Sequence, residues 1–266
     1  MLNEEKRKRI EKLKAEYADL DMKQNSKKLT LNSTYGLLAN KYNFMYSPEQ
    51  QINVCLTGQL FLLMCGEIVA KNGGVVTSYN TDGLNFYCDK ENYNSLNIDL
   101  FGLELDSGQV LEYTPYKSTY HRDVNNYLAI KPDGVKGKGF MATGGLMKNP
   151  TNIICVDAIT AYLTNNTPIE QTIKGCEDVT KFISIRTVQG GAVWRNEYLG
   201  KAVRFYYSKG GDTITYKKNG NKVPRSDGAK PLMDLPESLP KDLNYQWYID
   251  EAISMLGDLG VNYVRK

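Results

Sequence analysis

Near the N-terminus, four residues follow one another at four-residue intervals: an amide, a lysine, a second amide and a glycine. The residues are Gln24, Lys28, Asn32 and Gly36. On a helix this spacing drifts by only about 40° per step, so the four residues would form one stripe. Such a stripe makes a poor core face but a good contact for the phosphates and sugar of a nucleoside triphosphate. The alternative explanation is a solvated helix face.

The segment from Lys28 to Gly36, KLTLNSTYG, matches the Kx3NSxYG motif of family B DNA polymerases at every fixed position. Gln24 also matches a residue that is frequent in that family. The resemblance implies that Lys28 binds the incoming triphosphate and that Tyr35 lies against the nascent base pair. By their chemistry, Asn32 would contact phosphate or sugar, and Gly36 would let the base pair approach.

Two helix-forming stretches are expected to position the stripe. Residues 3–17 and about 22–40 are rich in strong helix formers. Between them, residues 18–21 offer Asp19 or Asp21 as the N-cap of a second helix. The sequence therefore predicts an antiparallel helical hairpin.

In this predicted hairpin, basic residues of the first helix face the stripe. A turn near its middle would set Lys12 opposite Lys28 and Lys8 opposite Asn32. Family B polymerases carry a basic pair on the first helix of the fingers, so the resemblance implies that Lys8 and Lys12 also grip the phosphates. The first member of that pair is usually arginine. The alternatives for it are Arg7, Lys8 and Arg9.

A second group of polar residues forms a turn between two apolar segments. Residues 75–79 and 84–87 are expected to be strands, with Asp82 in the turn between them. A carboxylate at such a turn can bind Mg²⁺, although most polar turns are only turns. Next to the first motif, this turn resembles the YxDTDS motif of the same polymerases. The resemblance implies that Asp82 is a catalytic, metal-binding aspartate.

The match at this turn is imperfect. Ser78, Asn80 and Gly83 stand where the family has a tyrosine, the first aspartate and a serine. Asp82 aligns with the aspartate that ligates the catalytic metals. The expected Mg²⁺ chemistry is therefore retained, with one acidic group fewer.

A third group of residues resembles the elements that hold the primer strand in these polymerases. Lys117 and Tyr120 match a KKxY element in which Ser118 replaces the second lysine. Lys136 and Lys138 follow on a predicted hairpin, as in the basic strand of the family. A solvated hairpin explains the same residues equally well.

The segment 181–230 is basic, with eleven lysines and arginines against three acidic residues. Aromatic residues are interleaved with Arg195, Lys201 and Arg204. The segment occupies the position of the family's thumb, which the resemblance implies binds product duplex through its phosphates. Such contacts are independent of base sequence and sensitive to salt. A solvated surface is again the alternative.

These expectations combine into an α+β chain with three parts. Residues 1–40 would form helical-hairpin fingers, residues 41–148 an antiparallel β palm portion with packed helices, and residues 149–266 a mixed α/β thumb and C-terminal region. Further expected elements are helices at 48–70, 151–164, 168–182 and about 245–259, strands within 109–141 and 183–223, and turns at 132–134 and 219–220.

Bulk composition limits other possibilities. The net charge of +3 by itself indicates no partner. The five cysteines form no CxxC pair and there is one histidine, which argues against a structural zinc site or a disulfide framework. We therefore expect a reducing cytoplasm, that of the host cell if the protein is viral. Polar residues interrupt the apolar stretch 54–70, so we expect a buried helix and no contact with a membrane.

Phosphoryl transfer by two metal ions needs more than one carboxylate. Family B polymerases supply another aspartate from a DxxSLYPS motif before the fingers, and the sequence contains no such segment. The resemblance therefore implies the C-terminal part of a polymerase of bacteriophage or viral type. Its substrates would be dNTPs and primer–template DNA. Its partner would be an N-terminal polypeptide that carries the exonuclease and the motif A aspartate.

Two questions stay open at this point. Met1 is either the natural start of one polypeptide in a two-chain enzyme or a boundary within a longer protein. The function is either DNA synthesis or that of a catalytically silent nucleic-acid-binding subunit. The retention of Lys28 and Asp82 favours DNA synthesis. A metal-dependent glycosyltransferase would leave the Kx3NSxYG match unexplained.

Overall fold

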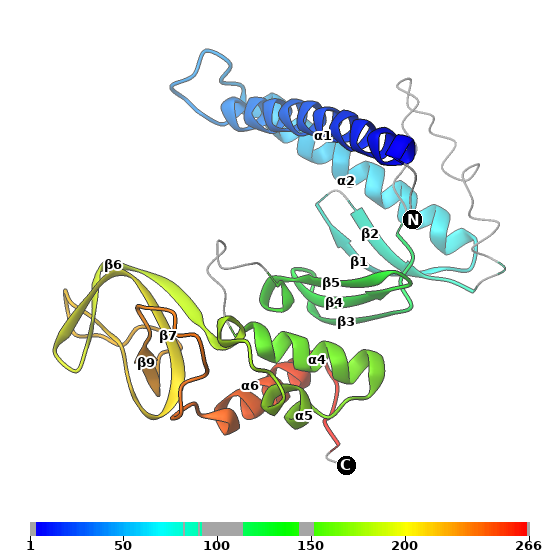
Figure 1. Cartoon of the computed structure of the whole chain (residues 1–266). Coiled ribbons are helices and arrows are strands. Elements are labelled where there is room, and N and C mark those ends of the chain that lie inside the picture. The colour runs from blue at the N-terminus through cyan, green and yellow to red at the C-terminus, as the bar shows by residue number, and fades with distance from the viewer. Residues whose placement is uncertain (1–3, 82, 90, 92–113, 144–151, 265–266) are drawn as a thin grey trace. The chain divides into compact units, whose positions relative to one another are not determined.

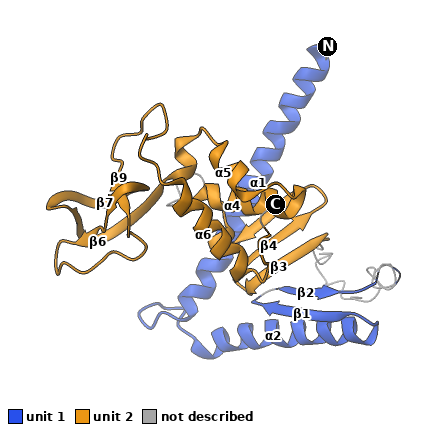
Figure 2. Ribbon diagram, turned by 90° about the horizontal axis from the view of Figure 1, so that it is seen from below, with its two compact units in different colours: residues 1–111 blue, residues 112–266 orange. Residues whose placement is uncertain are grey.

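The computed structural model describes residues 4–81, 83–89, 91, 114–143 and 152–264. The chain divides into two compact units, residues 1–111 and residues 112–266 (Figure 2). This division falls within the predicted palm portion. Both units combine helices with antiparallel strands, so the prediction of an α+β chain is confirmed.

Unit 1 consists of two long helices followed by a hairpin (Figure 1). The helices are α1 (Glu4–Leu38) and α2 (Pro48–Lys71), and the strands are β1 (Val75–Asn80) and β2 (Gly83–Tyr87). Proline occupies the first turn of α2, where its missing N–H costs nothing. The predicted helix at 48–70 and the predicted strand pair are confirmed.

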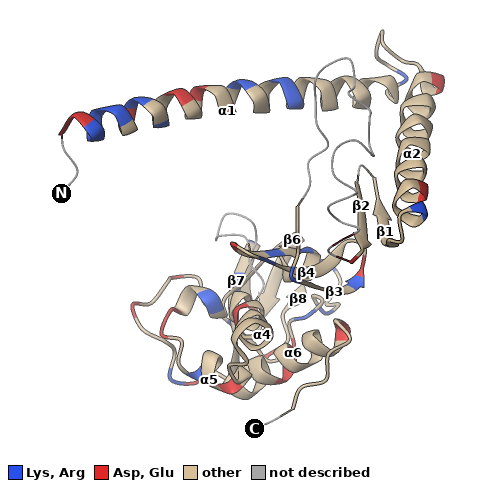
Figure 3. Ribbon diagram, turned by 90° about the vertical axis from the view of Figure 1, so that its right-hand side faces the viewer, with Lys and Arg blue, Asp and Glu red and all other residues tan. Residues whose placement is uncertain are grey.

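α1 runs without interruption from Glu4 to Leu38, so the predicted helical hairpin is wrong for this structure. Residues 18–21, the expected connection, contain no glycine or proline that would end a helix. Asp19, expected as a cap, instead accepts a hydrogen bond of 2.7 Å from Lys23 along the same helix. Groups of acidic and basic residues alternate along α1 as far as Lys28 (Figure 3), and none of the residues of α1 is buried.

Most of α2 is exposed. Its buried residues are Cys65, Gly66 and Val69. The side chains of Leu56, Leu60, Leu63 and Met64 are between 49% and 60% exposed. The expectation of a buried helix is therefore wrong for the described part of the chain, because apolar residues surround α2 on more sides than one hairpin covers. By length and composition α2 could cross a membrane, but core helices meet the same criterion, so this is weak evidence.

The contact between α2 and the hairpin requires glycine at two positions. A Cβ on Gly66 would overlap the hydroxyl of Tyr79 in β1. A Cβ on Gly74 would lie 2.6 Å from Cγ1 of Val69. These close approaches let α2 lie directly against the strand that leads to the Asp82 turn.

Unit 2 begins with a three-stranded antiparallel sheet. Its strands are β3 (Ser118–Asp123), β4 (Asn126–Lys131) and β5 (Gly134–Lys138), in that order. Lys131 pairs with Gly134, so Pro132 and Asp133 form the loop and the predicted turn is confirmed. The short 3₁₀ helix η2 (Gly139–Met141) follows.

Three helices pack together in unit 2: α4 (Ile153–Asn165), α5 (Ile169–Lys174) and α6 (Tyr245–Asp258) (Figure 1). The single helix predicted at 168–182 is instead two elements. α5 ends before Gly175, and the 3₁₀ helix η4 (Val179–Phe182) follows. Asp178 caps the N-terminus of η4, because its carboxylate accepts from the amide of Thr180 at 2.9 Å.

A second sheet lies between η4 and α6 in the sequence. Its strands are β6 (Ser184–Trp194), β7 (Glu197–Asp212), β8 (Thr215–Tyr216) and β9 (Ala229–Pro231). They are ordered β8-β6-β7-β9. Thr215 bridges to Lys222 and Gly220 has a φ of 68°, which confirms the predicted turn at Asn219–Gly220.

One buried tyrosine joins these parts of unit 2. The hydroxyl of Tyr248 in α6 donates to the carbonyl of Phe182 at 2.7 Å and accepts from the amide of Tyr207 at 2.9 Å. The rings of Phe182 and Tyr248 meet edge-on, with centroids 5.1 Å apart. Both side chains are fully buried. Hydrogen bonds and packing thus fix η4, β7 and α6 to one another.

Candidate nucleotide and nucleic-acid interface

The polar stripe lies on α1, as its spacing predicts. Gln24, Lys28, Asn32 and Gly36 are all exposed. The residues three and four positions from Lys28 include no aspartate or glutamate. Lys28 therefore has no partner at the spacing that pairs other lysines of this helix with carboxylates. Its ammonium group is placed to meet an anion from outside the helix.

Lys8 and Lys12 are not brought to this stripe. Because α1 is continuous, Lys12 lies about 24 Å from Lys28 along the helix axis. Lys8 pairs with Glu4 at 3.5 Å, and Lys12 with Glu16 at 3.9 Å. These are solvated pairs of the weak surface kind. In this conformation the two lysines and Lys28 do not share one triphosphate.

Tyr35 makes a contact that the sequence did not predict. Its hydroxyl lies 2.9 Å from Sγ of Cys55 in α2. This hydrogen bond is the main reason that the pKa of Tyr35 is raised above its ordinary value. The ring is still 37% exposed. Cys55 therefore fixes the direction of Tyr35 beside the stripe, and no local motif of the sequence identifies it.

The turn of the β1–β2 hairpin is held by side-chain hydrogen bonds. Asn80 pairs with Gly83, so the loop between them has two residues. Thr81 has a φ of 45°, a left-handed conformation that is costly for a β-branched residue. Its hydroxyl donates to Oδ1 of Asn80 at 3.1 Å. Asp82, the predicted catalytic aspartate, lies outside the described residues.

Within the described ranges, no cluster of three or more histidine, cysteine, aspartate or glutamate side chains could hold a metal ion. Asp82 and the amide of Asn80 would supply oxygen ligands of the kind Mg²⁺ prefers. One carboxylate is too few for a two-metal site. The residues of the turn alone therefore do not make such a site, which would need further carboxylates from elsewhere.

The lysines predicted to hold the primer share one sheet. Lys136 pairs with Ala129, and Lys138 pairs with Tyr127, so both point to the same side of β5. Lys117 precedes β3, and its amide extends the ladder by donating to the carbonyl of Ile130 at 2.7 Å. Its side chain then falls on the face of Lys136 and Lys138.

Tyr120 lies apart from these lysines. It pairs with Leu128, and both pack against the core of unit 2. Lys136 also interacts with two tyrosines that the sequence motif does not include. Partial burial lowers its pKa, but interactions with Tyr116 and Tyr127 raise the value by more. The sheet therefore collects the lysines on one face and places Tyr120 on the other.

The basic residues predicted for the thumb do not converge. Arg195 lies in the β6–β7 turn, stacks on Trp194, and bonds to Asp212 at 3.3 Å. Lys201 and Arg204 are three residues apart on β7, so they point to opposite faces. Arg204 is half-buried, and a guanidinium nitrogen donates to the carbonyl of Met233 at 3.3 Å. Of the three, Lys201 is the exposed cation on a strand face.

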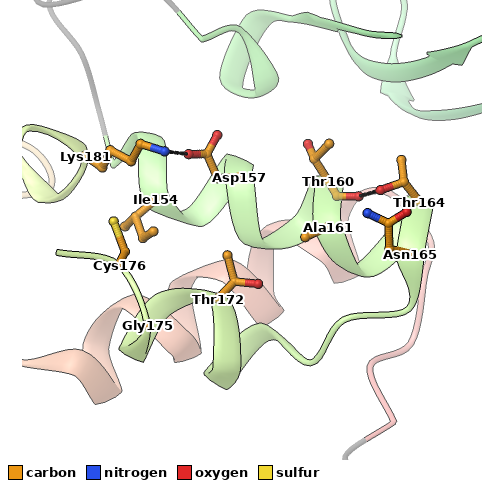
Figure 4. A pocket seen from close by; sticks show the side chains of 10 residues that line it. All are labelled: Ile154, Asp157, Thr160, Ala161, Thr164, Asn165, Thr172, Gly175, Cys176 and Lys181. Carbon is orange, nitrogen blue, oxygen red and sulfur yellow. Dashed lines mark hydrogen bonds and ion pairs between the residues drawn. The ribbon is translucent and has the colours of Figure 1, made fainter. Parts of the chain in front are cut away.

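A hollow of about 560 Å³ lies between α4, α5 and η4 (Figure 4). Lys181 and Asp157 form an ion pair of 2.8 Å at its edge, so their charges offset each other. None of the residues predicted from the sequence lines it. The hollow is therefore separate from the interface described above.

Two further residues, His121 and Lys131, share the lysine-rich face of the sheet, although no motif match includes them. His121 pairs with Tyr127, and Lys131 follows Ala129 by two positions on β4. Strand alternation around the predicted hairpin would have identified both. Comparisons of the chain with protein-family models and with curated proteins found no match.

Proposed function

We propose that this chain takes part in template-directed DNA synthesis, in which a nucleotide is transferred from a dNTP to the 3′-hydroxyl of a primer. In this proposal the chain contributes the nucleotide-binding helix and one metal-binding aspartate, as the resemblance to family B polymerases implies. A polypeptide segment outside these 266 residues contributes the motif A aspartate. Mg²⁺ held by both would supply the Lewis acid.

The observation that carries this proposal is the exposed stripe of Gln24, Lys28, Asn32 and Gly36 on α1. An ammonium group between two amides, with no acidic residue at helical spacing, fits a triphosphate, because charge-assisted hydrogen bonds to phosphate are the stronger class. A merely solvated helix face would not require this order of residues. The strained Thr81 beside Asp82 gives separate support, since strain of this kind gathers at functional turns.

Replacing Lys28 tests the nucleotide-binding role. In the assembled enzyme, Lys28→Ala should raise KM for dNTP by a factor that corresponds to about 1.5–3 kcal/mol, with a smaller effect on kcat. The matched control is Lys27→Ala, because Lys27 is also exposed and also has no acidic residue three or four positions away, but lies about 100° away around the helix. Steady-state kinetics that show equal KM values for both variants would exclude the role.

Replacing Asp82 tests whether the chain is catalytic or silent. The pure chain should bind primer–template DNA without extending it, and addition of the partner segment should restore synthesis. Asp82→Asn should then abolish primer extension while DNA affinity stays within about twofold, because the loss is confined to metal binding. Asp89→Asn is the control, because Asp89 is an exposed carboxylate beyond the other end of β2. Full extension by Asp82→Asn would favour the silent subunit or another site.

A further inference from the structure

The sheet formed by β3, β4 and β5 has two unlike faces. Tyr120 and Leu128 are paired on one face, and both belong to the core of unit 2. Tyr127 and Ala129 flank Leu128 along β4, so alternation puts them on the opposite face. Both are buried, yet neither is part of that core cluster. We call this second face the lysine face.

Four lysines belong to the lysine face. They are Lys117, Lys131, Lys136 and Lys138. Lys131 is half-buried, and the other three are exposed. The acidic residue of the β4–β5 loop, Asp133, lies at the end of the sheet. A face with this excess of positive charge suits a polyanion that lies across the three strands.

His121 lies among these lysines and is the single histidine of the chain. Its ring stacks on that of Tyr127, with centroids 5.1 Å apart and planes at 29°. Tyr127 also pairs with Lys138, so His121 and Lys138 flank it from either side. Two strand spacings separate them, which is about 9.5 Å. The imidazole is therefore within reach of the same extended anion as the lysines.

The acidic residue close to His121 in the chain, Asp123, forms its ion pair with Arg122 and not with the imidazole. Arg122 alternates to the other face, where it pairs with Asp123 at 3.3 Å and with Asp258 of α6 at 3.7 Å. Asp123 also accepts from the side chain of Asn126 at 2.9 Å. Among the described residues of the lysine face, the titratable groups on the strands beside His121 are Tyr127 and the lysines. Partial burial lowers the pKa of His121, so the ring is mostly neutral near neutral pH.

We propose that the lysine face binds the phosphodiester backbone of a nucleic-acid strand, with Lys131 and His121 acting beside the three lysines identified from the sequence, and that His121 contributes a positive charge when a strand is bound. This rests on the proposed function, which supplies the nucleic acid. A phosphate next to the imidazole favours its protonated form. Binding therefore takes up a proton, and affinity rises as pH falls.

The test measures binding of the full chain to a fluorescent primer–template duplex by anisotropy. Between about pH 7.5 and about pH 5.5, the wild-type affinity should rise about ten- to a hundredfold, as expected for one added charge-assisted contact. The slope of log affinity against log salt should steepen by about 0.9, because one more phosphate is neutralised. No other side chain has an ordinary pKa in this range, so the change can be assigned to His121.

Two substitutions of His121 separate charge from packing. His121→Phe keeps a ring that can stack on Tyr127 but cannot bind a proton, so affinity should no longer depend on pH in this range. His121→Lys is charged throughout and should bind at about pH 7.5 as tightly as the wild type does at about pH 5.5. Circular dichroism and thermal melting would confirm that both variants fold. A pH dependence that persists in His121→Phe overturns the proposal.

Lys131 gives a second measurement that does not depend on pH. Lys131→Gln should flatten the salt slope by about 0.9 at both pH values. Lys174→Gln, an exposed lysine of α5 away from the sheet, should leave the slope unchanged. An unchanged slope for Lys131→Gln would remove Lys131 from the interface. If the assembled enzyme synthesises DNA but substitution of His121 does not change DNA binding, this inference alone is overturned. If DNA binding depends on His121 but no synthesis is found, the proposed function alone is overturned.

Discussion

Units 1 and 2 differ in how many of their side chains are buried and in which motif residues they contain. Unit 2 buries one continuous cluster that includes Tyr248 and Phe182 and connects its second sheet to its helices. In unit 1, the described side chains that are buried belong to Cys65 and Val69. The residues proposed to bind the nucleotide and the metal show the reverse distribution, because the Kx3NSxYG match and Asp82 both lie in unit 1. Fold stability and the proposed chemistry therefore depend on different parts of the chain.

This difference has a consequence for unit 1. A two-stranded sheet is at best marginally stable by itself, and a long helix without buried residues depends on propensity and surface pairs. The half-exposed leucines of α2 leave apolar surface that the described residues of unit 1 do not cover. We therefore expect unit 1 to gain stability from contacts beyond those residues, whereas unit 2 supplies its own core.

The largest expected effect comes from the core of unit 2. Phe182→Ala removes a fully buried ring that packs on Tyr248, and should lower the free energy of unfolding by about 3–5 kcal/mol. Leu60→Ala in α2 removes a side chain that is 60% exposed, and should change it by less than about 0.5 kcal/mol. Urea unfolding followed by circular dichroism measures both. Similar losses in the two variants would break the contrast between the units.

A smaller effect is expected from the polar network around Asp242. Its donors are the hydroxyls of Tyr206 and Ser208 and the ammonium group of Lys230. Partial burial raises the pKa of Asp242, but these donors lower it by more, to about 2. The side chain of Asp242 is 35% exposed, so after allowing for solvent screening we expect Asp242→Asn to cost about 1–2 kcal/mol at neutral pH.

The pH dependence of this effect has a definite sign. Because the folded pKa is depressed, the stabilisation is complete above the unfolded pKa of about 4 and disappears as pH falls towards about 2. Thermal melting between about pH 2 and about pH 7 should therefore show the wild type and Asp242→Asn converging at the acid end. Asp250→Asn, on the exposed side of α6, is the control. A difference that stays constant with pH would contradict this account.

Local signals in the sequence predicted most of the regular elements. Pro48 marks the start of α2, and short turns at 132–133 and 219–220 mark hairpins, because such residues restrict the backbone wherever they occur. The same reasoning failed for α1. Asp19 is a possible N-cap, but residues 18–21 contain no helix breaker, so the helix continues through them and Asp19 bonds within it.

The contacts that build the candidate site were harder to predict. Helix geometry alone predicts that Lys28 and Asn32 lie on one stripe, and in the structure both are exposed on α1. The bond between Tyr35 and Cys55 joins two helices and has no periodic signature. The separation of Tyr120 from the lysines follows from strand alternation, but only once the start of β3 is known. Long-range partners depend on tertiary packing, which no local pattern of residues records.

The smallest expected effect separates stability from function within unit 1. No atom lies within 4 Å of a Cβ built on Gly36, so the fold accepts alanine there. Alanine is favoured over glycine inside a helix, and Gly36→Ala should raise stability by about 0.5–1 kcal/mol. In the assembled enzyme it should nevertheless slow nucleotide incorporation, because the methyl group would occupy the space of the nascent base pair.

Gly58→Ala in α2 is the matched control, because a Cβ there also meets no atom within 4 Å. It should give a similar gain in stability and leave incorporation unchanged. Thermal melting and primer extension on both variants make the comparison complete. If Gly36→Ala incorporates nucleotides as fast as Gly58→Ala, Gly36 only lowers the stability of α1 and has no role in incorporation. The Kx3NSxYG match would then lose the role of its last residue, and Lys28 would have to carry the proposed function without it.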